Sequence, residues 1–162
     1  MDFSRDKNLN FDQAKKILFN VLGEWKIMAL ASSVNDHVMV RNVSCIFYEN
    51  RVFFKTDINF RKTQQIIKNP NVALCFNGVQ IEGMAENKGL VIEEKSGAFK
   101  KKYNKFLKES YNKYSHEDTE ILIEVHPKYV EIWDTSENGY AYQIFLDFQK
   151  EEVIVKPYDV KQ

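Results

Sequence analysis

Three cationic side chains in the first half of the chain have the types and spacing to bind an anion. Arg41 interrupts the otherwise apolar segment HVMVRNVSCIFY, and Arg61 and Lys62 follow the polar turn at 57–59. An arginine in a half-buried strand needs an anionic partner, because burying an unpaired charge is costly. A helix that begins at Arg61 would present free N–H groups and the positive end of its dipole to the same anion.

The position of Arg61 and Lys62 favours a ligand, because cations at the start of a helix do not stabilise it. Together with the Thr56 hydroxyl and the Asn59 amide, they would converge on one phosphate. Each charge-assisted hydrogen bond from an arginine to such a group is worth roughly 1.5–3 kcal/mol.

A simpler interpretation of these cations needs no ligand. Arg41 would then pair with a surface carboxylate such as Glu49 or Glu82, and Arg61 and Lys62 would be ordinary exposed helix residues. On residue types alone, this second interpretation is favoured for Arg41.

No other side chain is identifiable as a catalyst, so the catalytic residues stay unknown at this point. The three histidines, His37, His116 and His126, are scattered and lack metal-ligand spacing, so no metal site is predicted. Cys45 and Cys75 lie in apolar segments, and we expect two buried thiols in a reducing cytoplasm. There is no Gly-rich phosphate loop and no GxSxG motif.

Helical periodicity occurs in two longer segments. Apolar residues spaced three and four apart predict a helix over 11–22, with Asn10 as its N-cap and Gln13 as the capping-box partner. The segment 90–114 is rich in Lys, Glu and Tyr, and its aromatic residues recur at helical spacing. We expect one or two helices there.

Strand patterns separated by turn residues account for most of the remaining chain. A short helix over 60–68 would interrupt them, with Ile66 and Ile67 facing inward. Many strands with short turns favour a mainly β (α+β) fold, a small antiparallel barrel with peripheral helices. The predicted strands are 25–32, 37–48, 51–56, 71–77, 79–87, 119–125, 128–133, 140–148 and 153–157.

Length and charge set the wider limits. The 162 residues predict a single domain over 1–162, with 1–9 as a loosely ordered tail. Lys+Arg and Asp+Glu both number 23, so the balanced charge argues against a general nucleic-acid binder. No apolar run approaches the length of a membrane span, and the first residues do not form a signal peptide. We therefore expect a cytoplasmic protein with no membrane or nucleic-acid partner.

The order of several short pieces resembles the pyridoxamine 5′-phosphate oxidase-like family of FMN-binding split barrels. The resemblance is best over 25–87. The order and spacing of the pieces carry it, since no single piece is specific. The matching pieces are Arg41-Asn42-Val43, Phe54-Lys55-Thr56, Arg61-Lys62, Asn69-Pro70-Asn71-Val72-Ala73-Leu74 and Glu82-Gly83-Met84-Ala85.

The resemblance implies a homodimer with FMN at the subunit interface. It implies that Arg41 reaches the flavin phosphate or ribityl chain, and that Asn42 and Val43 pass along the edge of the ring. It further implies that Arg61 and Lys62 bind the phosphate, with two more residues beside the flavin: Lys55 and Thr56. We expect the Lys55 cation to favour the reduced, anionic flavin.

The segment near Trp133 resembles the family only in part. Glu131-Ile132-Trp133 is similar to the start of the oxidase signature, in which the tryptophan contacts flavin from the neighbouring subunit. The oxidases continue with Arg-Xaa-His-Asp-Arg, which holds pyridoxal phosphate, whereas this chain continues DTSENGYAY. A second phosphate would have nothing to pair with, so we do not expect a true pyridoxamine-phosphate oxidase.

The sequence therefore predicts an FMN-dependent oxidoreductase of the general-stress or nitroimidazole-resistance type. It would pass electrons from a reduced nicotinamide to a small acceptor, the cofactor supplying the redox chemistry. Two alternatives stay open: a barrel that holds flavin or haem without turnover, and a deazaflavin-dependent reductase.

Overall fold

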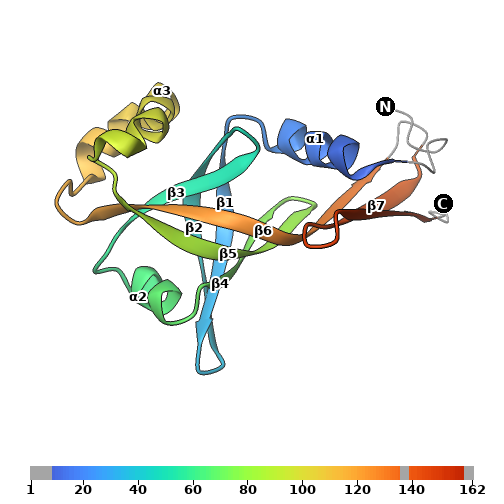
Figure 1. Cartoon of the computed structure of the whole chain (residues 1–162), viewed down its shortest axis with the longest axis horizontal. Coiled ribbons are helices and arrows are strands. Elements are labelled where there is room, and N and C mark those ends of the chain that lie inside the picture. The colour runs from blue at the N-terminus through green and yellow to red at the C-terminus, as the bar shows by residue number, and fades with distance from the viewer. Residues whose placement is uncertain (1–8, 136–138, 159–162) are drawn as a thin grey trace.

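A computed structural model describes residues 9–135 and 139–158 of the chain (Figure 1). The expectation of a loose tail over 1–9 falls almost entirely outside these residues. The elements in chain order are α1 (Phe11–Leu22), β1 (Trp25–Val34), β2 (His37–Tyr48), β3 (Arg51–Asp57), α2 (Arg61–Lys68), β4 (Asn71–Phe76), β5 (Val79–Leu90), the 3₁₀ turn η1 (Glu94–Ser96), α3 (Gly97–Tyr114), β6 (Glu120–Thr135), β7 (Ala141–Asp147) and β8 (Glu152–Tyr158).

The strands form one antiparallel sheet in the order β3-β2-β1-β4-β5-β6-β7-β8. An additional pairing of β3 with β6 closes the first six of these strands into a barrel, while β7 and β8 extend the sheet beyond it. Closure pairs strand edges that would otherwise be free. The predicted fold class, a mainly β split barrel of antiparallel strands with peripheral helices, is confirmed.

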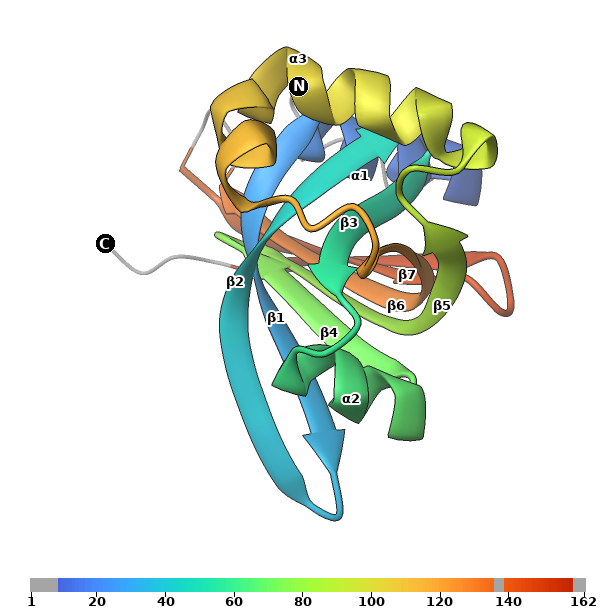
Figure 2. The same ribbon diagram turned by 90° about the vertical axis from the view of Figure 1, so that its left-hand side faces the viewer.

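Two hydrophobic clusters hold the helices against the sheet. The barrel core is continuous with α1, whose residues Ala14, Leu18 and Leu22 are fully buried. A second cluster lies outside the barrel, where Phe99 and Tyr103 of α3 pack with Ile46 of β2 and Phe53 of β3. Figure 2 shows α3 lying across this side of the strands. The helix α3 therefore covers the outer side of the strands that also form the candidate site.

The barrel is split between β2 and β3. The two strands pair only from Ile46 opposite Phe53 to Tyr48 opposite Arg51, so the earlier part of β2 does not pair with β3. The other edge of β2 pairs along its whole length with β1. Backbone groups at 42–44 of β2 therefore border an opening and not a neighbouring strand.

Strand β6 corrects the prediction of two strands flanking His126-Pro127. It runs unbroken from Glu120 to Thr135, because its register with β5 shifts beside Pro127, where a missing N–H is tolerated. Gly83 lies opposite this point. A Cβ added there would lie 2.7 Å from the His126 carbonyl oxygen, so the close approach requires glycine.

Two predicted burials are wrong. Ile67 is 57% exposed, because the inward face of α2 consists of Thr63 and Ile66, three residues apart. Cys75 is also exposed, since it lies on the outer face of β4, whereas Cys45 is buried as expected. Neither cysteine forms a disulfide. Within the residues that the structure describes, no helix is long and apolar enough to cross a lipid bilayer.

Candidate functional site

A cleft of about 460 Å³ opens where β2 and β3 separate. Its walls come from β2, the end of β3, the start of α2, α3 and the loop that follows α3. Five of the predicted site residues line it: Asn42, Val43, Lys55, Thr56 and Lys62. The tertiary structure thus brings together residues that the sequence only places in separate segments.

Arg41 lies beside this cleft, between β1 and α2. Its guanidinium donates to the Ser32 hydroxyl at 2.6 Å, to the Gln65 side-chain oxygen at 3.2 Å and to the Leu30 carbonyl at 3.4 Å. These acceptors are all neutral, so the charge has no carboxylate partner among residues 9–135 and 139–158, and the alternative pairing with Glu49 or Glu82 does not occur.

Arg61 and Lys62 begin α2, as predicted, and they too lack carboxylate partners within the described ranges. The N-cap residue Phe60 offers no side-chain hydrogen bond to the first turn. The Lys62 ammonium lies 4.6 Å from the centre of the Phe60 ring. Free N–H groups and two cations therefore meet at one helix start, the arrangement that binds an anion.

The three cations influence one another, which places them in one electrostatic neighbourhood. Burial lowers the pKa of Arg41, and the like charge of Arg61 lowers it further. Burial also lowers the pKa of Lys62, and Arg41 adds to this effect. An anion between them would relieve both costs, because it favours the charged form of each group.

Lys55 is placed in the cleft wall but its charge is already balanced. Its ammonium forms an ion pair with Glu120, and both side chains are more than nine-tenths buried. The rings of Tyr103 and Tyr111 lie 5.1 and 5.5 Å from the ammonium. The hypothesis that Lys55 favours reduced flavin therefore stays a prediction, now with a counter-charge beside it.

The Thr56 hydroxyl is engaged within the protein. It lies 2.9 Å from the Thr63 hydroxyl, which donates to the Asp57 carbonyl at 2.7 Å. Thr56 is 2% exposed. It consequently joins β3 to α2 and shapes the cleft floor, and its hydroxyl is not directed at the Arg61–Lys62 pair.

Trp133 is not part of the cleft. It lies near the other end of β6, is 46% exposed and packs 5.2 Å from Tyr158 of β8. A role beside the flavin would require a second copy of the chain. Residues 136–138, part of the run that departs from the oxidase signature, lie outside the described residues.

Sequence reasoning missed an Asp–His pair in the same cleft. Asp57 accepts hydrogen bonds from the Thr119 hydroxyl at 2.6 Å and the Asn59 N–H at 2.8 Å, and lies 3.1 Å from His116 Nδ1. These donors, the Thr119 hydroxyl foremost, lower the pKa of Asp57 to about 2. No local signal joins residues 57 and 116, because only the return of the chain after α3 brings them together.

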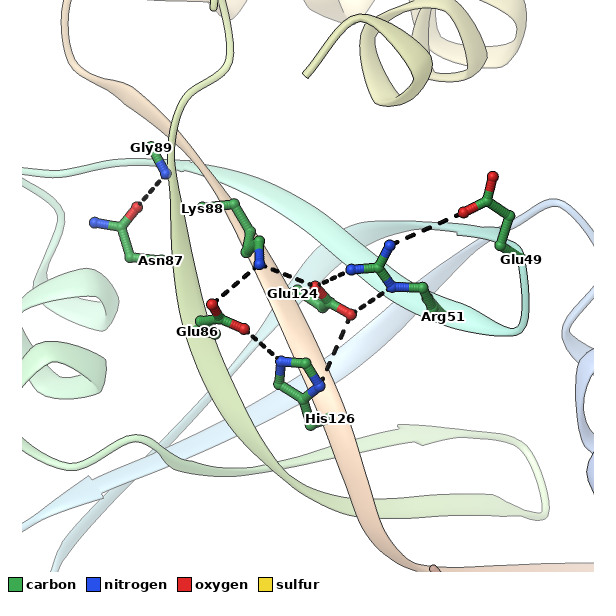
Figure 3. Close-up of polar contacts among 8 residues, drawn as sticks. All are labelled: Glu49, Arg51, Glu86, Asn87, Lys88, Gly89, Glu124 and His126. Atoms are coloured by element: carbon green, nitrogen blue, oxygen red, sulfur yellow. Dashed lines mark hydrogen bonds and ion pairs between the residues drawn. The ribbon is translucent and has the colours of Figure 1, made fainter. Parts of the chain in front are cut away.

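A second polar cluster lies on the outer wall of the barrel, away from the cleft (Figure 3). Glu124 is 3% exposed and accepts two hydrogen bonds from Arg51, at 2.6 and 2.5 Å. Lys88 lies 3.6 Å from Glu124 and 3.0 Å from Glu86. His126 Nε2 lies 2.6 Å from the other Glu86 oxygen. We call these five residues the Glu124 network.

The Glu124 network contains a potential metal-ligand set. Glu86, Glu124 and His126 each offer one ligand atom, and these atoms lie within 4.8 Å of one another. Arg51 and Lys88 already neutralise the two carboxylates, however, and a divalent ion would have to displace them. The contacts are those of a structural ion-pair network that ties β3, β5 and β6 together.

Comparison with known proteins agrees with this architecture. No known protein-family profile matches the chain. A pyridoxine/pyridoxamine 5′-phosphate oxidase from Vesicomyosocius okutanii subsp. Calyptogena okutanii (strain HA) is 34% identical over 85 residues, which cover 52% of this chain and 39% of that oxidase. The match therefore spans well under half the length of the relative.

Three solved structures have the same fold. PhzG from Burkholderia lata 383 superposes with a TM-score of 0.61 at 14% identity, covering 96% of this chain and 95% of its own. General Stress Protein 26 from Bacillus anthracis str. Sterne superposes with a TM-score of 0.58 at 18% identity, covering 83% of this chain and 98% of its own. A pyridoxamine 5′-phosphate oxidase-related, FMN-binding protein from Nostoc punctiforme superposes with a TM-score of 0.54 at 13% identity, covering 90% of this chain and 91% of its own.

At these identities the superpositions establish the fold. The chain is a split-barrel protein. Its resemblance to the pyridoxamine 5′-phosphate oxidase-like proteins, including the general-stress branch, is confirmed.

Proposed function

We propose that this chain binds FMN in the cleft between β2 and β3 and acts as an FMN-dependent oxidoreductase. The phosphate would bind to Arg61, Lys62 and the start of α2, with Arg41 beside it. Asn42 and Val43 would offer backbone groups along the edge of the ring. FMN would supply the transfer of electrons from a reduced nicotinamide to a small acceptor.

One observation carries the proposal: three cations share a neighbourhood in which none has a carboxylate partner within the described residues. By contrast, Arg51 and Lys55 of β3 pair with Glu124 and Glu120. Keeping unpaired like charges together costs stability unless an anion joins them. A phosphate, with its multiple acceptor oxygens, is the ligand that matches.

The named relatives support a flavin in particular. The Nostoc protein with this fold is described as FMN-binding, and the partial sequence match is to an oxidase of phosphorylated pyridoxine. The run after Trp133 offers no arginine or histidine for a second phosphate. We therefore propose a reaction other than pyridoxamine-phosphate oxidation.

We also propose that the protein is a homodimer. An outer face of β1, β2 and β4 carries small and apolar residues that nothing in the described chain covers. Val38 and Val40 are each 68% exposed, and Ala31 and Ala73 line the shallow surface beside them. A second copy would cover this face, and Trp133 of one copy would be available to the cleft of the other.

The test of the cofactor compares FMN with riboflavin, which lacks the phosphate. We expect wild-type protein to bind FMN roughly 100-fold more tightly, since two charge-assisted bonds supply about 3 kcal/mol. Combining Arg61→Gln with Lys62→Gln should remove this preference and leave riboflavin affinity unchanged. Flavin fluorescence quenching measures both constants.

The matched control is Lys16→Gln, which removes an exposed lysine from α1 and should change neither constant. Equal affinities for FMN and riboflavin in the wild type would refute the phosphate site. If haem or a deazaflavin copurifies with the protein, as recognised from its visible spectrum, the cofactor is that molecule and not FMN.

Turnover and assembly need separate measurements. Anaerobic NADH or NADPH should bleach the bound flavin, and menadione should restore its colour. A flavin that stays oxidised would indicate a binding protein without turnover.

Light scattering should give a dimer for wild type and a monomer for Val40→Glu, whereas Val21→Glu, on the exposed side of α1, should stay dimeric.

A further inference from the structure

His116 has a position that the proposed binding of FMN does not explain. It lies in the loop between α3 and β6, lines the cleft, and its side chain is 65% exposed. Its Nδ1 lies 3.1 Å from Asp57 Oδ2. Its Nε2 has no hydrogen-bond partner among the described residues.

The contact with Asp57 fixes which nitrogen carries a hydrogen. The Asp57 carboxylate is 8% exposed and is held ionised by its other donors, so it acts only as an acceptor. His116 Nδ1 must therefore donate to it. The remaining nitrogen, Nε2, is left to hold or release a proton on the open side of the ring.

The His116 side chain is not needed to form its own loop. The His116 carbonyl accepts hydrogen bonds from the backbone N–H groups of Thr119 and Glu120, at 3.0 and 2.8 Å. The Thr119 hydroxyl independently ties the loop to Asp57 at 2.6 Å. An exposed imidazole that is aimed by a buried carboxylate, in a loop that is already closed, is better explained by chemistry in the cleft.

We propose that His116 is a catalytic residue that donates a proton from Nε2 to the electron acceptor, and that Asp57 is its positioning residue. This inference rests on the proposed FMN-dependent function. The acceptor class is a small compound with conjugated carbonyl groups, such as a quinone. Its reduction requires two electrons and two protons, and leaves a basic oxygen that takes the second proton.

The balance of the step is simple. A reduced flavin held in the cleft would supply two electrons and one proton as a hydride. The Nε2–H bond of the His116 imidazolium breaks, an O–H bond forms on the acceptor, and the neutral imidazole regains a proton from water. Two exposed aromatic rings in the cleft wall, Tyr114 and Phe60, suit a planar acceptor.

The pH dependence of this step also involves the other charges of the cleft. They lie on β3, α2, α3 and β6, the elements around His116, and are Lys55, Asp57, Lys62, Lys113 and Glu120. Lys55 and Glu120 neutralise each other. Asp57 stays ionised throughout the neutral range. The proton that the proposed step transfers therefore comes from the imidazole.

The test uses the FMN-loaded protein, menadione as the acceptor probe, and three variants. His116→Gln keeps an N–H donor for Asp57 but cannot deliver a proton. We expect its kcat to fall roughly 100-fold. We also expect the kcat of the wild type to decrease at alkaline pH, and this decrease to be absent in His116→Gln. Its affinity for FMN should stay within about twofold of wild type. Asp57→Asn should lower kcat less than His116→Gln does, and should shift the pH at which kcat decreases.

The control is His37→Gln, at the exposed tip of the β1–β2 hairpin, which should behave as wild type. A second readout needs no cofactor: ¹⁵N-resolved NMR of the apo protein should show His116 protonated at Nδ1, and Asp57→Asn should lose this preference.

The outcomes separate the two proposals. A wild-type protein without affinity for FMN overturns the proposed function, and this inference with it. Normal FMN binding with unchanged kcat and pH profile in His116→Gln overturns this inference alone. Wild-type protein that binds FMN but does not reduce menadione also overturns it, as does a neutral His116 ring that carries its hydrogen on Nε2 and not on Nδ1 in the NMR spectrum.

Discussion

The cleft between β2 and β3 and the Glu124 network use similar residue types with opposite charge balance. In the network, Glu124 is surrounded by Arg51, Lys88 and His126, so each buried charge meets an opposite one. Lys62 lines the cleft and Arg41 and Arg61 lie beside it, and none of the three has a carboxylate partner in the described chain. The first arrangement stabilises the fold, and we propose that the second lowers stability in exchange for a binding site.

The backbone explains why the two regions differ. The network spans β3, β5 and β6, which pair residue by residue, so side chains on neighbouring strands meet across the ladder. The cations of the cleft lie where β2 and β3 stop pairing. A gap in strand pairing leaves room for a ligand, and a paired ladder does not.

The largest effect that would sharpen this comparison is expected from Glu124→Ala. It leaves Arg51 without its bidentate partner, and we expect a loss of about 2 kcal/mol in the free energy of unfolding. The figure is below that of a fully buried pair, since Arg51 is 42% exposed. Urea denaturation of the apo protein measures it.

Glu49→Ala is the matched control for that experiment. Glu49 lies 3.9 Å from Arg51 but is 74% exposed, so its removal should change stability by less than about 0.5 kcal/mol. Similar losses in both variants would show that burial does not distinguish the network.

A smaller effect is expected from acid, through Asp57 in the cleft. Its pKa falls from an ordinary 3.8 to about 2 in the folded protein. Its contribution is therefore complete above pH 3.8 and is lost as the pH falls through this range. We expect Asp57→Asn to remove about 1 kcal/mol of this acid dependence, discounted for nearby solvent.

Urea midpoints from about pH 5 to about pH 2 give the acid dependence directly. Asp36→Asn, in the exposed β1–β2 turn, should keep the wild-type slope. If Asp57→Asn loses stability with acid as steeply as wild type does, the hydrogen bonds of Asp57 do not stabilise its charged form.

The smallest effect concerns the cations themselves and has the opposite sign. Without ligand, the combined Arg61→Gln and Lys62→Gln variant should be more stable than wild type by about 0.5 kcal/mol, because like charges leave a helix start. Saturating FMN should reverse the order, since only wild type gains binding energy. A less stable apo variant would mean that these cations do have a structural partner.

Local patterns were sufficient for most of the helices and strands. The capping box predicted at Asn10 and Gln13 forms with both hydrogen bonds present. The helix predicted over 11–22 also forms with these bounds, as α1. Each feature depends on residues within a few positions of one another, so the sequence contains its full physical cause.

Contacts between distant segments were not predictable in this way. Ile67 faces solvent because α2 packs on β1 through Ile66, and Lys55 is neutralised by a glutamate 65 residues away. His116 reaches Asp57 only after the chain has passed through β4, β5 and α3. Composition and periodicity do not specify which loop returns to which strand end.

The sequence by itself determined the helix starts, most of the strands and the cations for which we propose an anion, because these follow from neighbouring side chains and backbone geometry. Only the tertiary structure decided that β2 and β3 separate beside those cations, and that Glu120 and His116 complete the cleft. Barrel closure fixes these positions, since pairing β3 with β6 brings the end of one strand to the start of another far along the chain.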